Sequence, residues 1–345
     1  MRDSFEIGGQ LIAAGTRRVI DLPVSRLSNH TPVMLPVHVV HGSGPGPALF
    51  VTAAVHGDEI IGVEIIRRLM KTLTPERLDG TLLCVPIVNA FGFISRTRYL
   101  PDQRDLNRSF PGSEGGSLAA KLAHLLMNEV VRHCDVGIDL HSAAASRTNL
   151  PQIRTDLRSA RAQHLAEAFG APVILRSPER DGSLRKAAGR LGKDVLVYEA
   201  GEALRFDPHS IQIGVRGVQR VMAALGMSAS PEPAAPAHAD AAPIVAVSSR
   251  WVRAPEGGIL RVMKTIGDRI DEGERLGIIS NPYDDTDETE VVASICGLVI
   301  GRTNLPVVNL GDALFHIARM PEASAARVSP VDPSADPVFD EDEII

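Results

Sequence analysis

Several scarcities in this 345-residue sequence limit the classes of protein to which it can belong. No uninterrupted apolar stretch approaches the roughly 20 residues that span a bilayer. The amino terminus, MRDSFEIGGQLIAAG, lacks the basic and apolar regions of a secretion signal. Basic charge is not in excess either, because the net charge is -6 at pH 7 and no long basic run is present. We therefore expect a cytoplasmic protein with no membrane partner and no nucleic-acid partner.

Cysteine is scarce as well. Only Cys84, Cys134 and Cys296 occur, far apart and without C-x-x-C spacing. This pattern argues against a cysteine metal site, a redox pair and a disulfide framework. We expect three buried free thiols in a reducing compartment. The expected ligands are therefore small molecules or proteins.

The length and composition predict two domains. Hydrophobic residues make up 44% of the chain, enough for a sizeable core. Residues 228–243, SASPEPAAPAHADAAP, are rich in Ala and Pro and predict a linker. Residues 321–345, which end in DEDEII, predict an acidic disordered tail. What remains is a domain over 1–227 and a smaller one over 244–320.

The first domain alternates short apolar runs with helical patterns. Consecutive Val, Ile and Leu, typical of strands buried on both faces, occur in 35–42, 47–55, 81–88, 135–140, 171–176 and 194–200. Apolar residues repeat at helical spacing in 59–73, 117–134, 156–170 and 211–226. Ser117 is a candidate helix cap and Gly170 a candidate helix stop. The alternation predicts an α/β domain with a mainly parallel or mixed sheet between helices, whose ligands bind at the carboxyl ends of the strands.

The segment 244–320 has a different pattern. Short strand-like pieces separated by Gly, Asp and Asn turns predict an all-β unit. The order of its glycines and apolar residues resembles the flattened β-barrel of biotinyl and lipoyl carrier domains. That family carries its prosthetic group on a lysine at a hairpin apex. Here the apex YDDTDETE has no lysine and Lys264 lies well away from it, so we expect a lid, substrate-shaping or oligomerisation role.

Ionisable residues gather at the ends of three predicted strands. His56 and Glu59 follow the first, His141 follows the second and Glu199 the third. A catalytic zinc site commonly takes three protein ligands, often two histidines and a carboxylate. A lone H-x-x-E is weak evidence and His141 alone reads equally well as a structural histidine. Together, at the carboxyl ends of strands in one domain, they predict a zinc site.

The neighbours of these residues fit the same prediction. Gly57 is expected to let the backbone turn between His56 and Glu59. Asp58 or Asp139 is expected to orient a ligand imidazole, since metal-bound histidines usually need such a partner.

A long polar loop follows the predicted strand 81–88. Residues 89–112 hold Arg96, Arg98, Arg104 and Arg108 within 13 positions, together with Asp105 and Asn107. Such a loop reads either as a solvated charged surface or as a substrate clamp. A guanidinium beside an amide donor suits the capture of a carboxylate, and a further arginine suits the stabilisation of an oxyanion.

The motifs HGDE, N-x-x-G, RDLNRSFPG, DLHS and YEAGE, in this order over about 150 residues, resemble the succinylglutamate desuccinylase and aspartoacylase family of carboxypeptidase A-like zinc hydrolases. The resemblance implies that one zinc ion is bound by His56, Glu59 and His141. It also implies that Asn107 and Arg108 bind a substrate carboxylate.

The same resemblance implies that Glu199 is the general base. Glu202 is its rival, although Glu199 matches the family's E-x-G. The resemblance further implies an arginine that polarises the scissile carbonyl. This arginine corresponds either to Arg98 or to Arg104, because each position matches only part of the sequence that surrounds it in the family.

The expected reaction is hydrolysis of a small anionic N-acylated substrate, such as an N-acyl amino acid or an acetylated diaminobutyrate. A zinc centre with two neutral histidines and one glutamate carries about one positive charge, which with Arg108 favours an anion. A metallocarboxypeptidase acting on short peptides and a non-catalytic zinc-binding or assembly protein are the alternatives. Tyr283 is a candidate contact from the C-terminal segment or a solvated turn residue. Oligomeric state stays open, a homo-oligomer included.

Overall fold

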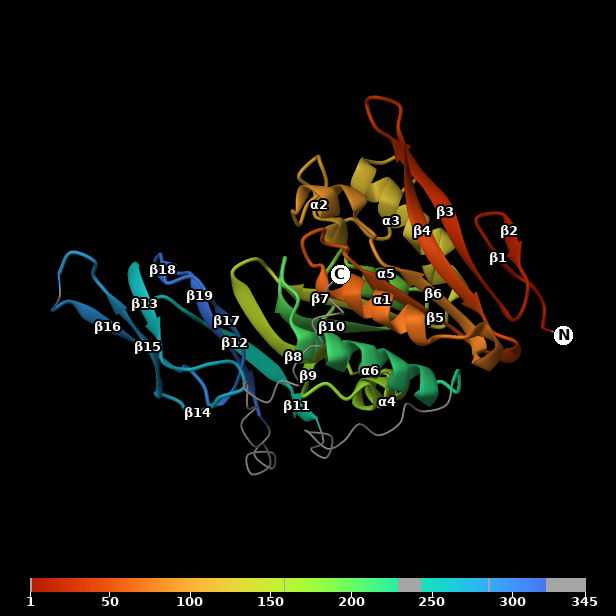
Figure 1. Ribbon diagram of the computed structural model, residues 1–345. Helices are drawn as coiled ribbons and strands as arrows, with labels where there is room; N and C mark the ends of the chain where they lie inside the picture. Colours follow the sequence, from red (N-terminus) through yellow and green to blue (C-terminus); the bar gives the residue numbers. More distant parts are fainter. Residues whose placement is uncertain (1, 158, 229–242, 285, 321–345) are drawn as a thin grey trace, which may run out of the picture.

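One mixed β-sheet joins the N-terminal and C-terminal parts of the chain in the computed structural model, which describes residues 2–157, 159–228, 243–284 and 286–320 (Figure 1). Its strands are β3 (Thr16–Arg26), β4 (Pro32–His41), β5 (Gly44–Ala53), β6 (Asp79–Val85), β7 (Val136–Ala143), β8 (Arg147–Thr155), β9 (Val173–Arg176), β10 (Asp194–Glu202), β11 (Ile244–Ala246), β12 (Ser248–Arg253), β14 (Arg269–Ile270), β17 (Gly297–Thr303) and β19 (Ala313–Arg319). The predicted tail and nearly all of the predicted linker lie outside the described residues.

The order of strands is β12-β19-β17-β8-β10-β7-β5-β6-β4-β3, with β9, β11 and β14 paired beside this path. The central strands β10, β7, β5 and β6 are parallel to one another, whereas β8 and β4 pair with their central neighbours in antiparallel fashion. The sheet is therefore mixed, as predicted. The carboxyl ends of β5, β7 and β10 lie together at one edge.

Helices cover both faces of the sheet (Figure 1). One core cluster joins the sheet to α1 (Ile61–Thr72), α4 (Ala160–Phe169) and α6 (Pro208–Ala224). A second joins the other face to α2 (Ala90–Ser95), α3 (Leu118–Glu129) and α5 (Leu184–Gly189). Neighbouring residues of β5 enter opposite cores, Phe50 one and Val51 the other. Such a strand is buried on both faces, which explains its continuous apolar sequence.

The predicted helices and strands of the first domain are present, displaced at their ends by a few residues. Ser117 caps α3 by accepting a hydrogen bond from the backbone N–H of Ala120, and Gly170 ends α4 with φ at 77°. Strands β3 and β8 were not predicted. Each contains a proline and several polar residues, which weaken the sequence signal of a strand.

The C-terminal segment contains strands and no helix within residues 243–284 and 286–320. The strands β13 (Gly258–Val262), β15 (Arg275–Ser280), β16 (Glu288–Val292) and β18 (Val307–Val308) form a separate sheet. The others extend the main sheet, where β17 pairs with β8 and β11 with β9. The all-β character is confirmed, while the barrel type and the domain boundary stay predictions.

The remaining elements are short. They are β1 (Phe5–Ile7), β2 (Gln10–Ile12) and the 3-10 turns η1 (Pro75–Arg77), η2 (Leu106–Arg108) and η3 (Val131–His133). No helix in the described part of the chain has the length and apolarity to cross a membrane. Among the cysteines, Cys84 and Cys134 are buried as expected, whereas Cys296 is exposed. The prediction of a third buried thiol is therefore wrong, because Cys296 lies in the turn before β17 rather than in a core strand.

Candidate metal centre and active site

The three predicted metal ligands meet where β5 and β7 lie side by side. His56 follows the end of β5, Glu59 comes just before α1, and His141 lies in β7. Because β5 and β7 are parallel neighbours with Thr52 opposite Asp139, their carboxyl ends reach the same edge of the sheet. All three side chains are buried, with relative exposures of 4%, 2% and 3%. Their ligand atoms lie within 4.8 Å of one another.

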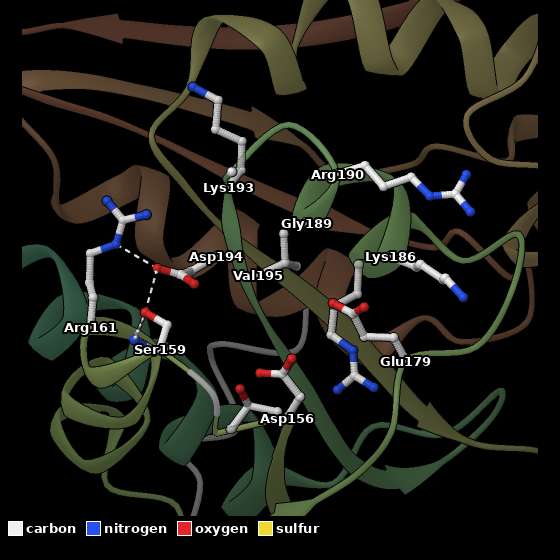
Figure 2. Close-up of a pocket in the computed structure, with 14 residues that line it drawn as sticks. Asp156, Ser159, Arg161, Glu179, Lys186, Gly189, Arg190, Lys193, Asp194 and Val195 are labelled. Atoms are coloured by element: carbon white, nitrogen blue, oxygen red, sulfur yellow. Dashed lines mark hydrogen bonds and ion pairs between the residues drawn. The ribbon is translucent and has the colours of Figure 1, made fainter.

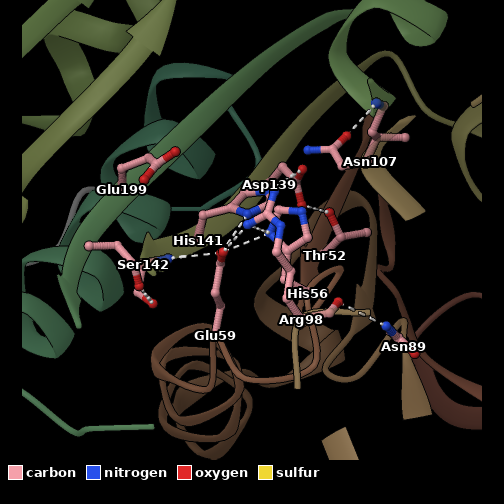
Figure 3. A network of polar contacts seen from close by, with 12 residues as sticks. Thr52, His56, Glu59, Asn89, Arg98, Asn107, Asp139, His141, Ser142 and Glu199 are labelled. Atoms are coloured by element: carbon pink, nitrogen blue, oxygen red, sulfur yellow. Dashed lines mark hydrogen bonds and ion pairs between the residues drawn. The ribbon is translucent and has the colours of Figure 1, made fainter. Parts of the chain in front are cut away.

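Glu59 stands between the two imidazoles (Figure 3). Its Oε1 lies 2.7 Å from Nδ1 of His56, and its Oε2 lies 2.7 Å from Nδ1 of His141. The backbone N–H of Ser142 also donates to Oε2, at 3.2 Å. Two imidazole nitrogens and a carboxylate converging from separate strand ends are a donor set that fits zinc.

Each histidine has an acidic partner on its other ring nitrogen. Nε2 of His141 lies 2.7 Å from Oδ2 of Asp139, and Nε2 of His56 lies 3.2 Å from Oδ1 of Asp105. The expectation that Asp139 orients an imidazole is confirmed. For Asp58 it is wrong: no hydrogen bond joins it to either imidazole among the described residues, and its Oδ1 is buried without a partner.

Asp105 is therefore a partner of His56 that the sequence did not indicate. It lies 49 positions from His56, and no local spacing links a loop aspartate to a strand-end histidine.

The charges in this group reinforce one another. Burial acts against ionisation of Glu59, but the positive imidazoles of His56 and His141 outweigh it and hold the pKa of Glu59 well below its usual range. Burial also acts against the charged form of His141, yet Asp139 and Glu59 raise its pKa well above the ordinary value. The pKa of Asp105 is lowered, because His56 and Arg98 outweigh the effect of burial. The acidic groups thus favour positive charge between them, which a divalent cation supplies.

Gly57 lies in the turn between His56 and Glu59, as expected. Its φ does not lie in the left-handed region; that conformation belongs to Ala54, with φ at 48°. A Cβ on Gly57 would instead stand 1.9 Å from the carbonyl carbon of Gly92 in α2. The predicted turn is present, since the backbone N–H of Glu59 donates to the carbonyl oxygen of His56 at 3.1 Å, and the close approach of α2 is what requires a glycine in it.

Arg98 and Arg104 are clearly separated by the structure. Arg98 Nη1 donates to Glu59 Oε1 at 3.1 Å, and its Nη2 donates to Asp105 Oδ2 at 2.9 Å. Arg104 is exposed, and its Nη1 lies 3.5 Å from Oδ2 of Asp102, which is outside the group. Only Arg98 of the two contacts the predicted metal ligands.

Asn107 and Arg108 lie in the turn η2 beside this group. The side-chain oxygen of Asn107 accepts a hydrogen bond from the backbone N–H of Leu184 at 2.9 Å, which ties the loop to α5 (Figure 3). Its amide nitrogen is the part that can still donate to a ligand. Arg108 is exposed and donates from Nη1 to the backbone oxygen of Asn107.

Glu199 lies on β10 directly beside His141 of β7 in the parallel register. Register partners on adjacent strands point to the same face, so Glu199 and the predicted metal ligand His141 share one face of the sheet. Glu202 comes after a bulge in this pairing. Its two oxygens accept hydrogen bonds from the backbone N–H of Ser146 at 2.8 Å and from Nδ2 of Asn304 at 3.0 Å. Glu202 thus links the backbone after β7 to the side chain of Asn304 in the C-terminal segment.

Two other features lie apart from this group. A cavity of about 500 Å³ opens at the opposite, amino-terminal end of β10, lined by Asp194, Arg161, Glu179 and Arg185 among others (Figure 2). None of the predicted site residues lines it. Tyr283 is 96% exposed in the turn between β15 and β16, so it is a solvated turn residue.

A mixed α/β sheet that brings a His-Glu-His group to the carboxyl ends of its strands defines an α/β protein with a candidate metal site. The model of the succinylglutamate desuccinylase/aspartoacylase catalytic domain matches residues 45–225. The chain belongs to this family, and the resemblance found in the sequence is confirmed.

Individual relatives extend the match over most of the chain. The N-alpha-acetyl-L-2,4-diaminobutyric acid deacetylase of Halomonas elongata is 30% identical over 303 residues, which cover 84% of this chain and 87% of that protein. The crystal structure of succinylglutamatedesuccinylase/aspartoacylase from Rhodobacter sphaeroides matches with a TM-score of 0.79 and 29% identity over 88% of this chain and 96% of the other. The ectoine utilization protein EutE (DoeB) from Ruegeria pomeroyi, at 23% identity, has the same fold with a TM-score of 0.79, covering 92% and 99% of the two chains.

Proposed function

We propose that this protein is a zinc-dependent deacylase that hydrolyses the amide bond of a small N-acyl amino acid. The observation that supports it most directly is the position of Glu199 next to His141 on the shared face of the sheet, beside the group of His56 and Glu59. A metal site and a carboxylate that can exchange protons are the two parts that water attack on an amide requires.

The donor atoms and their outer partners suit zinc. His56 and His141 would bind it through Nδ1, since each Nε2 already faces an aspartate, and Glu59 would bind it through its carboxylate. Zinc in this place supplies a Lewis acid that polarises the acyl carbonyl and lowers the pKa of a water molecule.

The protein side chains then carry the proton and the substrate. Glu199 accepts a proton from the attacking water and delivers it to the nitrogen of the leaving amine as the C–N bond breaks. Arg98 donates hydrogen bonds to the negative charge that develops on the acyl oxygen. Asn107 and Arg108 bind the carboxylate of the amino acid part. The products are a free carboxylate and a free amine.

The substrate is proposed from the relatives. The Halomonas protein is named for N-alpha-acetyl-L-2,4-diaminobutyric acid, and this compound therefore comes first among the candidates. N-acetyl, N-succinyl and N-formyl amino acids complete the panel, and short peptides test the carboxypeptidase alternative.

The experiment combines metal content with turnover. Zinc is measured by mass spectrometry on the purified chain, and release of free amine is measured across the panel. Glu199→Gln should keep zinc and lose turnover by about 100-fold or more, since general acid–base catalysis contributes 10²–10⁴-fold. Glu202→Gln, the matched control, keeps an acceptor for Ser146 and should retain turnover within a few fold. A zinc-loaded chain inactive on every compound, or a Glu199→Gln variant with near-normal turnover, would overturn the proposal.

A further inference from the structure

The carboxylate of Glu199 is held by one strand. Its Oε2 accepts a hydrogen bond from Nδ2 of Asn149 at 3.0 Å, and its Oε1 lies 3.3 Å from Nη1 of Arg154. Both partners belong to β8, the antiparallel neighbour of β10. Glu199 has no side-chain contact of this kind to any other strand in the part of the chain that the structure describes. Contacts that fix the position of β8 therefore also fix the orientation of the Glu199 carboxylate.

Asn149 lies between two glycines on the neighbouring strands. It pairs with Gly201 of β10 on one side and with Gly301 of β17 on the other. A Cβ built on Gly301 would stand 2.8 Å from Oδ1 of Asn149, closer than real Cβ contacts come. The Asn149 amide thus occupies the space that a side chain at position 301 would fill. With an exposure of 6%, it has little room to turn elsewhere.

The C-terminal segment meets β8 at further points around Asn149. Nδ2 of Asn304 donates to the hydroxyl of Thr148 at 2.7 Å and to Glu202 at 3.0 Å. The side chain of Gln152, which pairs with Glu199 across the sheet, donates to the backbone oxygen of Ile300 at 3.5 Å. These contacts join β17 to the strand that carries both partners of Glu199.

We propose that Asn149 is a positioning residue for Glu199 and that Gly301 maintains its orientation, so that the C-terminal segment sets the direction of the proton-accepting carboxylate. This inference rests on the proposed function, because it requires Glu199 to be the general base. It gives the C-terminal segment a role that does not depend on covering the site. The link runs from Gly301 through the Asn149 amide to Oε2 of Glu199.

The chemistry explains why an amide suits this position. A carboxylate that rotates freely presents its lone pairs to the attacking water only part of the time, and misplacement by about 1 Å can cost about 100-fold in rate. A neutral N–H donor fixes the carboxylate without adding charge. An aspartate of the same size would remove the donor and place a like charge beside Glu199.

The test compares Asn149→Ala with Asn149→Asp in the full-length, zinc-loaded chain, at a temperature where both variants are folded. We expect kcat to fall by about 10- to 100-fold with KM changed by less than about threefold. The Asp variant should be the slower one, with unchanged zinc content. If Asn149 only filled space, the Ala variant would be the slower of the two.

A second pair of variants tests the link to the C-terminal segment. Gly301→Ala should lower kcat in the same way, because the added Cβ displaces Oδ1 of Asn149. Gly257→Ala is the matched control in the same segment, since its Cβ would meet nothing closer than 3.5 Å. Wild-type kcat in Asn149→Ala, alongside inactive Glu199→Gln, would overturn this inference and leave the proposed function standing. Near-normal turnover in Glu199→Gln would instead remove the proposed function itself.

Discussion

Nε2 of His141 lies 2.7 Å from Asp139 while Nδ1 of the same ring lies 2.7 Å from Glu59. The hydroxyl of Thr52 donates to the second oxygen of Asp139 at 2.7 Å. Thr52 therefore fixes the carboxylate of Asp139, and Asp139 directs the Nδ1 atom of the His141 imidazole toward the proposed zinc position. An outer carboxylate of this kind fixes the ring and increases the basicity of the ligand.

Replacing Asp139 should weaken zinc binding without removing a ligand. We expect Asp139→Asn to lower zinc affinity by about 10- to 100-fold, the usual effect of losing such a partner. Competition with a chromophoric chelator measures the affinity. Asp102→Asn is the control, because Asp102 is exposed and pairs only with Arg104 among the predicted site residues. Equal zinc affinity in wild type and Asp139→Asn would show that the contact does not support the metal.

Substitution of Arg98 and substitution of Arg104 should have different effects on kcat, because only Arg98 contacts the predicted metal ligands. Arg98→Met should lower kcat by about 100- to 1000-fold, the range seen when one donor to a developing oxyanion is lost. Arg104→Met should leave kcat and KM within about twofold, since its guanidinium lies outside the group. Initial rates on the best substrate of the panel decide between them. A large loss in Arg104→Met with an active Arg98→Met would reverse the assignment.

The sequence predicted those parts of the fold that depend on local patterns. Continuous apolar runs such as that of β5 identify a strand buried on both faces, and the proposed metal ligands follow such runs. The topology rule for α/β sheets then places the ends of β5, β7 and β10 together. His56, Glu59 and His141 could be grouped in this way because each is fixed to a strand end.

The parts that could not be predicted depend on distant contacts. Asp105 contacts His56 from a loop. Asn149 contacts Glu199 from β8, whose proline and polar residues weaken the sequence signal of a strand. Neither partner has a fixed spacing from the residue it contacts. The neighbour that excludes a side chain at Gly57 could not be predicted for the same reason, since its backbone belongs to α2, more than 30 positions away.

Gly57→Ala should destabilise the protein and its metal site together. The added Cβ would stand 1.9 Å from backbone atoms of Gly92, which a rotamer change cannot relieve. Overpacking of this kind costs about 1–3 kcal/mol, and the backbone must shift here between the two proposed ligands His56 and Glu59. We expect a lower Tm and less than stoichiometric zinc.

The control is Gly115→Ala, because a Cβ at Gly115 would meet nothing within 4 Å. Thermal unfolding and zinc content measured on both variants give the comparison. A Gly57→Ala variant with the Tm and zinc content of Gly115→Ala would contradict the close approach of α2.

His316 should make the stability of the protein depend on pH. It stacks on Trp251 with ring centroids 4.6 Å apart, and its Nε2 lies 2.8 Å from the hydroxyl of Ser249. Burial, assisted by the charge of Arg154, lowers the pKa of His316 to about 3. In the unfolded chain a histidine titrates near pH 6.5, so below about that pH the unfolded state binds a proton that the folded state does not.

Stability should therefore fall as the pH decreases below about 6.5, and His316 should contribute a slope of at most about 1.4 kcal/mol per pH unit. His316→Asn removes this contribution, although losing the stack lowers stability at every pH. Urea unfolding of zinc-free wild type and variant between pH 7 and pH 5 measures the two slopes, with the exposed His30→Asn as control. The slope should become shallower in His316→Asn alone. Parallel lines for wild type and His316→Asn would mean that this imidazole accepts a proton in the folded protein as readily as in the unfolded chain.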